Sequence, residues 1–211
     1  MNCDRIARWY RWLEYLGFGR ALERRRLAFL GNVKDARRVL VLGDGDGRFL
    51  VRLVEQNRGA STDYVDVSGR MLELARARAG EAGVTYHQAD ALRILLPLAE
   101  YDLIVTHFFL DCFDERDAAV LVDRVARSAR SDARWLISEF RQTAWWTRAV
   151  LNGLYFFFRV TTGLRTRQLV DHRPLLERNG FRLRKEETAR FGLLASELWE
   201  RNGCEFHREG S

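Results

Sequence analysis

The chain has 211 residues, 47% hydrophobic and 30% charged, which is typical of a folded domain and excludes a disordered, collagen-like or disulfide-rich chain. Its formal net charge of +6 and pI of about 9.6 would alone suggest a nucleic-acid or membrane partner. However, the basic excess lies in residues 1–38 and 141–173, whereas residues 39–140 are net acidic. A function must therefore account for an acidic centre between two basic segments.

Cysteine content and hydropathy bear on the compartment. Cys3, Cys112 and Cys204 are widely spaced and odd in number, which fits a reducing, cytoplasmic environment better than a disulfide framework. Cys204 and His207 have no second ligand pair, so we expect no metal site. The N-terminus shows no signal-peptide pattern, and the most apolar stretch, residues 149–158, is too short to span a bilayer.

Hydrophobic periodicity alternates between helix and strand patterns along most of the chain. Helical spacing is seen over residues 6–16, and a second short helix is expected over residues 20–30. The order predicted after that is strand 38–42, helix 49–56, strand 63–67, helix 71–79, strands 84–87 and 101–107, helix 117–128 and strand 134–140.

The last third of the chain departs from this rhythm. Residues 141–170 are rich in aromatic and basic side chains. Asp171 is then expected to cap a helix that has Pro174 in its first turn, and two closing strands are expected at residues 181–187 and 191–199. The pattern predicts an α/β fold: a doubly wound, mostly parallel seven-stranded sheet with helices on both faces and an antiparallel last strand.

A glycine turn, Gly43-Asp44-Gly45-Asp46-Gly47, follows the first predicted strand and opens a helix. Glycine lets the backbone turn tightly and lets a ligand approach it closely. Asp66 ends the next strand, where a carboxylate can accept both hydroxyls of a ribose. A dinucleotide fingerprint would need a third glycine where this chain has Arg48, whose bulk does not fit that close packing.

This compact spacing, with acids at the ends of the next two strands, resembles the class I S-adenosylmethionine-dependent methyltransferases over roughly residues 38–140. The resemblance implies a Rossmann-like fold, S-adenosyl-L-methionine as cofactor and glycines against its methionine part. It also implies that Asp66 binds the ribose and Asp90 the adenine amino group. The implied cofactor-binding residues are Gly43, Asp44, Gly45, Gly47, Asp66, Val67, Met71, Asp90, Ala91 and Thr106. Where the family usually has an acid, two positions before the first glycine, this chain has Val41, with Asp44 or Asp46 as candidate substitutes.

The chemistry of methyl transfer points to further residues. The reaction is an in-line displacement, so the protein must align the acceptor and exclude water, and a general base helps a hydroxyl acceptor. His107, at the end of the fourth strand, is the candidate base; the alternative is a structural histidine bonded to backbone. Glu139, at the end of the fifth strand, is the second catalytic candidate. Asp111 is expected to cap the following helix and His172 to lie at the surface.

The basic, aromatic segments are expected to cover the acceptor. We divide the chain into an N-terminal helical cover (1–37), a cofactor-binding core (38–140), an insert over the acceptor site (141–170) and the last helix with the closing strands (171–211). Tyr10, Trp146 and Tyr155 are the predicted acceptor-binding residues, because aromatic walls suit an apolar or aromatic small molecule. Arginines beside them suit an anionic group or peripheral contact with an anionic membrane. Alternatively, these aromatics pack as ordinary core.

These expectations favour a cytoplasmic methyltransferase acting on a hydrophobic or aromatic small molecule, with a loose likeness to quinone and lipid methyltransferases. The run Thr106-His107-Phe108-Phe109 replaces the Asn/Asp-Pro-Pro-Tyr/Phe run of many enzymes that methylate amino groups of nucleic acids or protein side chains. This difference counts against those substrates, and the acidic centre and the lack of a recognition motif count against nucleic acid as a partner. Two alternatives stay open: an RNA methyltransferase, and a non-catalytic binding protein that retains the fold.

Overall fold

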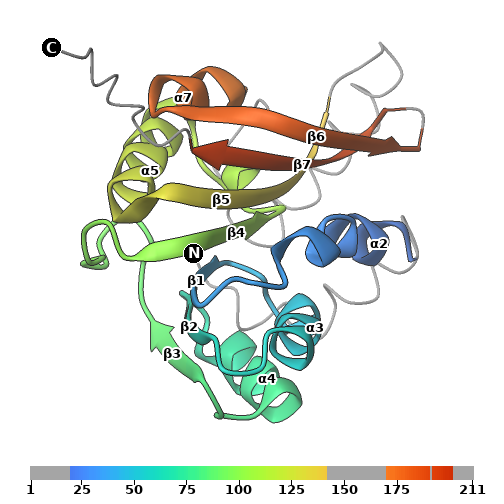
Figure 1. The fold of residues 1–211 in the computed structure, drawn as a ribbon, viewed down its shortest axis with the longest axis vertical. Helices are drawn as coiled ribbons and strands as arrows, with labels where there is room; N and C mark the ends of the chain where they lie inside the picture. Colours follow the sequence, from blue (N-terminus) through green and yellow to red (C-terminus); the bar gives the residue numbers. More distant parts are fainter. Residues whose placement is uncertain (1–19, 142–169, 191, 202–211) are drawn as a thin grey trace, which may run out of the picture.

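The computed structural model describes residues 20–141, 170–190 and 192–201 and forms one seven-stranded sheet in the order β3-β2-β1-β4-β5-β7-β6 (Figure 1). The strands are β1 (Arg38–Leu42), β2 (Ser61–Asp66), β3 (Val84–Gln88), β4 (Tyr101–His107), β5 (Ala129–Phe140), β6 (Phe181–Ala189) and β7 (Leu194–Arg201). β1 to β5 pair in parallel, whereas β7 is antiparallel to both β5 and β6. The predicted fold class is confirmed.

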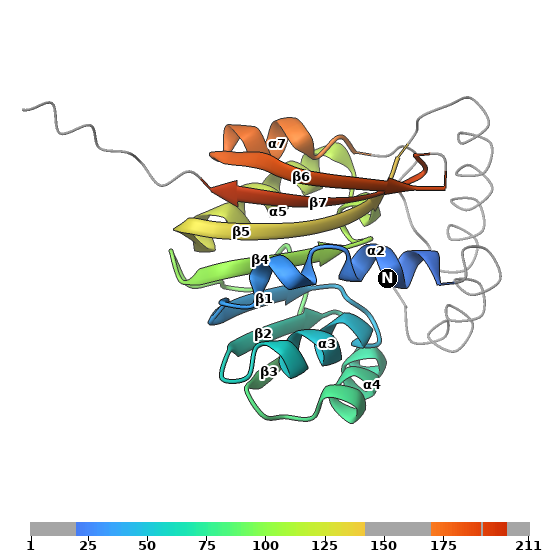
Figure 2. The same ribbon diagram turned by 45° about the vertical axis from the view of Figure 1, so that its right-hand side comes forward.

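Helices cover both faces of this sheet (Figure 2). Three helices, α2 (Ala21–Leu27), α3 (Arg48–Gln56) and α4 (Gly69–Ala79), lie on one face, and α5 (Glu115–Ser128) and α7 (Arg173–Arg178) lie on the other. Two short 3-10 helices, η2 (Leu30–Val33) and η3 (Leu110–Cys112), complete the described elements. None of the helices in the described ranges is long and apolar enough to cross a membrane; residues 149–158 lie outside those ranges.

The central strands are apolar on both sides because each face of the sheet builds its own core. In β1, Val39 and Val41 pack in the cluster under α3 and α4, while Leu40 and Leu42 pack in the cluster under α5 and α7. Side chains alternate between faces along a strand. Consecutive residues of one strand therefore contribute to different cores.

Helix capping differs from the prediction at two places. Asp114, not Asp111, caps α5, because its side chain accepts a hydrogen bond from the Asp117 backbone N–H at 2.8 Å. The residue at the N-cap of α7 is His172, one position after the predicted Asp171, whose Oδ1 accepts from the Arg173 N–H at 3.2 Å. Asp111 instead lies in η3, so its carboxylate is available for another role.

Candidate cofactor and acceptor site

The three glycines of the turn all have left-handed backbone conformations, but their surroundings differ. A Cβ atom on Gly43 would lie 2.1 Å from Cδ2 of Phe109, and one on Gly47 would lie 2.7 Å from Cα of Ala75. A Cβ atom on Gly45 would meet nothing within 4 Å. Gly43 and Gly47 therefore permit close internal packing, whereas Gly45 faces open space where a ligand can approach the backbone.

Asp44 is turned into the protein below this turn. Its side chain is 3% exposed, with Oδ2 3.4 Å from the backbone nitrogen of Leu50 and Oδ1 3.9 Å from Nε of Arg26 on α2. On the other side of the turn, the Tyr64 hydroxyl donates to the Gly45 carbonyl at 2.8 Å. These contacts fix the turn between α2, α3 and β2.

The second candidate substitute for the missing acid, Asp46, is engaged in ion pairs. Its Oδ2 lies 3.2 Å from Nε of Arg48 and 3.0 Å from a terminal nitrogen of Arg78. Val41 is fully buried in the core. Both candidate substitutes, Asp44 and Asp46, thus have arginine partners within the protein.

The nucleoside-side residues gather where β2 turns into α4. Asp66, at the end of β2, accepts a hydrogen bond from the Ser68 N–H at 2.8 Å, and Ser68 in turn caps α4 by accepting from the Met71 N–H at 3.2 Å. Val67 is 45% exposed, while Met71 is nearly buried. A carboxylate, an exposed apolar side chain and a helix start therefore lie within six residues.

Asp90 and Ala91 follow β3 at the same edge. The Ala89 N–H donates to the Asp66 carbonyl at 3.1 Å, which ties the residues after β3 to the end of β2. Asp90 is exposed and accepts from the Leu92 N–H at 2.9 Å, and Ala91 is buried. The carboxyl ends of β1, β2 and β3 thus bring the predicted ribose and adenine residues to one edge.

Thr106 lies inside the core. It is fully buried, and its hydroxyl accepts a hydrogen bond from Nε1 of Trp135 at 2.9 Å. A cofactor contact at this position would have to come from the backbone.

His107 is 2% exposed, and neither of its ring nitrogens has a hydrogen-bond partner. The ring of Phe49 packs edge-on against it at 4.7 Å between centroids. Burial lowers the pKa of His107 well below its usual value, and the positive charge of Arg26 lowers it further. The imidazole is therefore neutral, and taking up a proton here is unfavourable.

The chain turns sharply after β4. Phe108 has a φ of +53°, which is strained for a bulky residue, and its N–H donates to the Ser138 carbonyl at 2.6 Å. This turn places the ring of Phe109 against Gly43. Backbone strain and close packing thus coincide where β4 meets the glycine turn.

Glu139, near the end of β5, holds this turn from the other side. Its Oε1 accepts from the N–H groups of Phe109 at 3.1 Å and Leu110 at 2.8 Å. The side chain is 3% exposed, yet Oε2 has no hydrogen-bond partner. Burial raises the pKa of Glu139 well above its usual value, and the negative charge of Asp111 raises it further. A half-satisfied buried carboxyl group is costly unless a ligand completes it.

His107 and Glu139 do not lie together. In the register of β4 with β5, His107 is opposite Ser138, so these two side chains share a face and Glu139 points to the other face. The structure therefore places the two catalytic candidates on opposite sides of the sheet.

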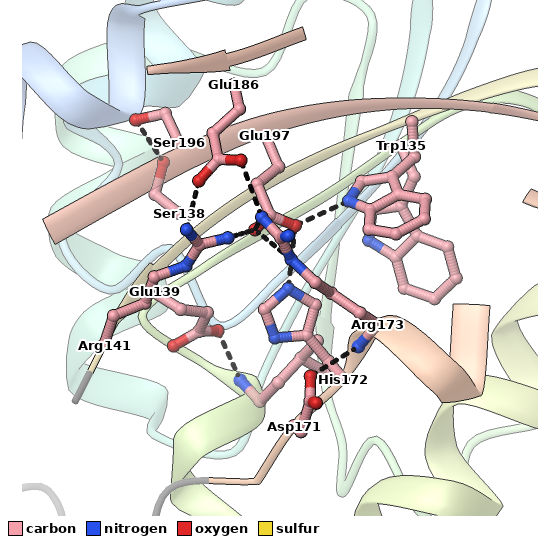
Figure 3. Close-up of polar contacts among 12 residues, drawn as sticks. Trp135, Ser138, Glu139, Arg141, Asp171, His172, Arg173, Glu186, Ser196 and Glu197 are labelled. Carbon is pink, nitrogen blue, oxygen red and sulfur yellow. Dashed lines mark hydrogen bonds and ion pairs between the residues drawn. The ribbon is translucent and has the colours of Figure 1, made fainter. Parts of the chain in front are cut away.

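A buried charge network beside Glu139 was not foreseen from the sequence (Figure 3). Glu197 on β7 is 1% exposed, and its Oε2 lies 2.9 Å from Nε2 of His172 and 2.7 Å from Nε1 of Trp199. Its Oε1 accepts from Arg141 and, at 2.9 Å, from Arg173. Burial opposes ionisation, but the hydrogen bond and charge of His172, with the other donors, hold the pKa of Glu197 below its usual value. His172 is buried, contrary to its expected surface position.

Some predicted residues lie outside the described ranges: Tyr10, Trp146 and Tyr155, and Cys204 and His207. Among the residues that the structure describes, no group of three or more His, Cys, Asp or Glu side chains is arranged to hold a metal ion.

The sequence and the fold are similar to those of known methyltransferases. Residues 39–132 match the family model described as a methyltransferase domain. A search of curated proteins found no match. Among solved structures, an S-adenosylmethionine-dependent methyltransferase from Mesorhizobium loti is similar, with 20% identity, a TM-score of 0.67, and coverage of 87% of this chain and 97% of that one.

Two further solved structures of methyltransferases are similar to this chain. Magnesium protoporphyrin IX methyltransferase from Synechocystis, solved with S-adenosylhomocysteine, is 19% identical with a TM-score of 0.64, over 94% of this chain and 85% of that one. The N-methyltransferase NodS from Bradyrhizobium japonicum is 13% identical with a TM-score of 0.63, over 86% and 97%. At such identities the likeness concerns the fold, and it does not select an acceptor.

The sheet order, the antiparallel β7 and the glycine turn define a Rossmann-like methyltransferase fold. Residues 39–132 are therefore a methyltransferase domain, and the described residues have the fold of the S-adenosylmethionine-dependent methyltransferases. The open space over Gly45 and the carboxylate of Asp66 fit this cofactor, which supplies an electrophilic methyl group when it is bound.

Proposed function

We propose that this methyltransferase acts on a hydrophobic or aromatic small molecule. The observation that carries the proposal is a group of aromatic rings at the carboxyl ends of β4 and β5. Phe108 packs on Phe140 at 5.2 Å between centroids, and Phe109 packs on Phe113 at 5.1 Å. The partly buried ring of Phe109 lies against Gly43 of the glycine turn, and an aromatic ring there suits a planar or apolar acceptor.

We further propose a division of roles among the predicted residues. Gly45, Asp66 and Asp90 bind the cofactor. Glu139, rather than His107, takes the acceptor's proton, because a second positive charge next to Arg26 is unfavourable for His107. His107 serves as a neutral hydrogen-bonding group at the end of β4. The remaining residues named for the cofactor keep their predicted role, Thr106 through its backbone.

The N-terminal segment and the insert, of which residues 1–19 and 142–169 lie outside the described ranges, belong to this proposal as well. Residues 1–37 and 141–170 cover the acceptor, with Tyr10, Trp146 and Tyr155 lining it, and the protein works in the cytoplasm. The basic side chains of these segments suit peripheral contact with an anionic membrane from which an apolar acceptor is drawn.

Calorimetry with S-adenosylhomocysteine tests the cofactor site directly. We expect micromolar binding to the wild-type protein and none to Asp66→Ala. Asp90→Ala should bind more weakly than wild type, because one contact with the adenine is lost. Wild-type protein that fails to bind at millimolar concentration, while correctly folded by circular dichroism, would contradict the proposed function.

A further inference from the structure

The Glu139 carboxyl group is placed to receive a ligand. One oxygen is fully used by the backbone of the turn after β4, and the other is buried without a hydrogen-bond partner. This turn carries Phe109, whose ring lies against Gly43. Glu139 is thus connected to the glycine turn through Phe109. Its side chain lies on the face of the sheet that carries α5 and α7.

Asp111 lies near Glu139 and adds a second negative charge. It is half-buried in η3, and burial raises its pKa to about 6. Its side-chain hydrogen bond comes from Sγ of Cys112, at 3.7 Å, which is a weak donor. Two neighbouring carboxyl groups with little access to water titrate as a coupled pair, and a positively charged ligand beside them is favourable.

The cations of this face are bound elsewhere. Arg141 and Arg173 both contact Glu197 and Glu186, and His172 bonds to Glu197 through Nε2. Within the described ranges, no ion pair joins an arginine or lysine to Asp111 or Glu139. Among the described residues, His172 acts on Asp111 through its charge, but no arginine or lysine pairs with Asp111 or Glu139, whereas the adjacent acid, Glu197, contacts Arg141, Arg173 and His172 (Figure 3).

Resting on the methyltransferase function proposed above, we propose that Glu139 and Asp111 bind the acceptor through a basic nitrogen, so that the acceptor is an amine on an apolar or aromatic body. A carboxylate or phosphate at this place would add negative charge to a buried acidic pair, which is unfavourable. An ammonium group supplies both the missing charge and a donor for the free oxygen of Glu139.

The pair also provides the proton step that an amine needs. A bound ammonium gives one proton to the carboxylate of Glu139, which leaves a neutral nitrogen with a free electron pair. That pair forms the new bond to the methyl carbon while the carbon–sulfur bond breaks and its electrons stay on sulfur. The methylated nitrogen keeps a positive charge, and Glu139 later releases its proton to water.

The test compares three small probes on protein saturated with S-adenosylhomocysteine: 2-phenylethylamine, 2-phenylethanol and phenylacetate, together with their naphthyl counterparts. Calorimetry measures their affinity, and release of S-adenosylhomocysteine from S-adenosylmethionine measures turnover. We expect the amines to bind at least about tenfold more tightly than the alcohols, the carboxylates not to bind, and only the amines to be methylated.

Variants locate the effect. Glu139→Gln keeps an oxygen for the Phe109 and Leu110 N–H groups but cannot take a proton, so amine affinity should fall about tenfold or more and turnover should be lost. The matched control is Glu177→Gln, on the exposed surface of α7, which should change neither. S-adenosylhomocysteine affinity should stay within about twofold of wild type in both variants.

Asp111 is a positioning residue, so its readout is the pH profile of amine turnover. Removing its charge in Asp111→Asn lowers the pKa of Glu139, and the acidic limb of the profile should therefore move to lower pH. The other charged groups around the pair are Glu197 on β7, His172 and Arg173 at the start of α7, and Arg141 after β5.

Three outcomes would overturn the amine assignment while leaving the proposed function intact: tighter binding of an alcohol or carboxylate, no effect of Glu139→Gln, or no binding of any probe to protein that still binds S-adenosylhomocysteine. Failure to bind S-adenosylhomocysteine at all would instead refute the proposed function on which the inference rests.

Discussion

Gly45→Ala tests whether this glycine is needed for ligand binding rather than for packing inside the protein. Gly45 has a φ of +71°, and a Cβ atom there would meet nothing within 4 Å. The substitution therefore adds backbone strain but no overlap. A left-handed conformation costs an L-residue about 1–2 kcal/mol, and for a chain of this length we expect the Tm to fall by about 2–8 °C.

The effect on binding should be larger than the effect on stability. If the cofactor lies over Gly45, a methyl group there occupies the space that the ligand needs, and S-adenosylhomocysteine affinity should drop by at least about tenfold, or 1.4 kcal/mol. Calorimetry on protein verified as folded by thermal melting measures both quantities in one preparation.

Gly43→Ala and Gly47→Ala are the matched comparisons. Their Cβ atoms would lie 2.1 Å from the ring of Phe109 and 2.7 Å from Cα of Ala75. Strain and overlap then add, and we expect the free energy of unfolding to fall by about 2–5 kcal/mol. Gly45→Ala protein that binds S-adenosylhomocysteine like wild type, or that loses as much stability as Gly43→Ala, would refute this reasoning.

Three further substitutions test the buried polar groups. Glu197→Gln leaves buried cations unpaired and should lower the free energy of unfolding in urea by about 3–5 kcal/mol. Glu186→Gln, in a more exposed position between the same arginines, should lower it by at most about 1 kcal/mol. Equal losses would contradict the buried network. Because the pKa of His107 is lowered in the folded state, His107 destabilises the protein as the pH falls below about 6.5. His107→Leu should therefore reduce the slope of the unfolding free energy against pH in this range by up to about 1.4 kcal/mol per pH unit. An unchanged slope would show that His107 titrates normally. Thr106→Val removes the acceptor for Trp135 and should lower stability by about 1–3 kcal/mol with unchanged S-adenosylhomocysteine affinity, and a selective loss of affinity would show that the hydroxyl contacts the cofactor.

The succession of strands and helices along the chain and the glycine turn could be predicted because their signals are local. β1 carries an apolar run from Val39 to Leu42, directly before the glycine turn, and β4 carries one from Leu103 to Val105, shortly before its end at His107. Buried parallel strands of this kind are separated by helices with clear apolar periodicity. The predicted ends of these elements differ from the observed ends by a few residues, as at β5, which begins at Ala129 rather than at residue 134.

The roles of Asp111 and Asp114 could not be separated from the sequence. Both are acids shortly before the same helix, and either could act as its N-cap. The choice depends on where η3 ends, and η3 is held by Glu139, 28 residues beyond Asp111. A contact over that separation leaves no periodic trace in the sequence.

Glu197 did leave a signal that could have been followed. Along β7, Ala195, Glu197 and Trp199 alternate with Ser196 and Leu198, so a period of two places the glutamate on a buried face together with a tryptophan. A buried acid in that position requires cations. The two arginines nearest in space, Arg141 and Arg173, flank the insert in sequence.

The ion pairs of Arg141 and Arg173 bear on the interpretation of the net positive charge of residues 141–173. Arg141 and Arg173 belong to the positively charged segment that first suggested a nucleic-acid partner, yet both are bound to Glu186 and Glu197 on the closing strands. An arginine held by buried carboxylates contributes little to a phosphate-binding surface. These two residues, which flank residues 142–169 in the sequence, instead both bind Glu197 on β7. The positive charge of Arg141 and Arg173 is therefore used in ion pairs with Glu186 and Glu197, and it does not support RNA as the acceptor.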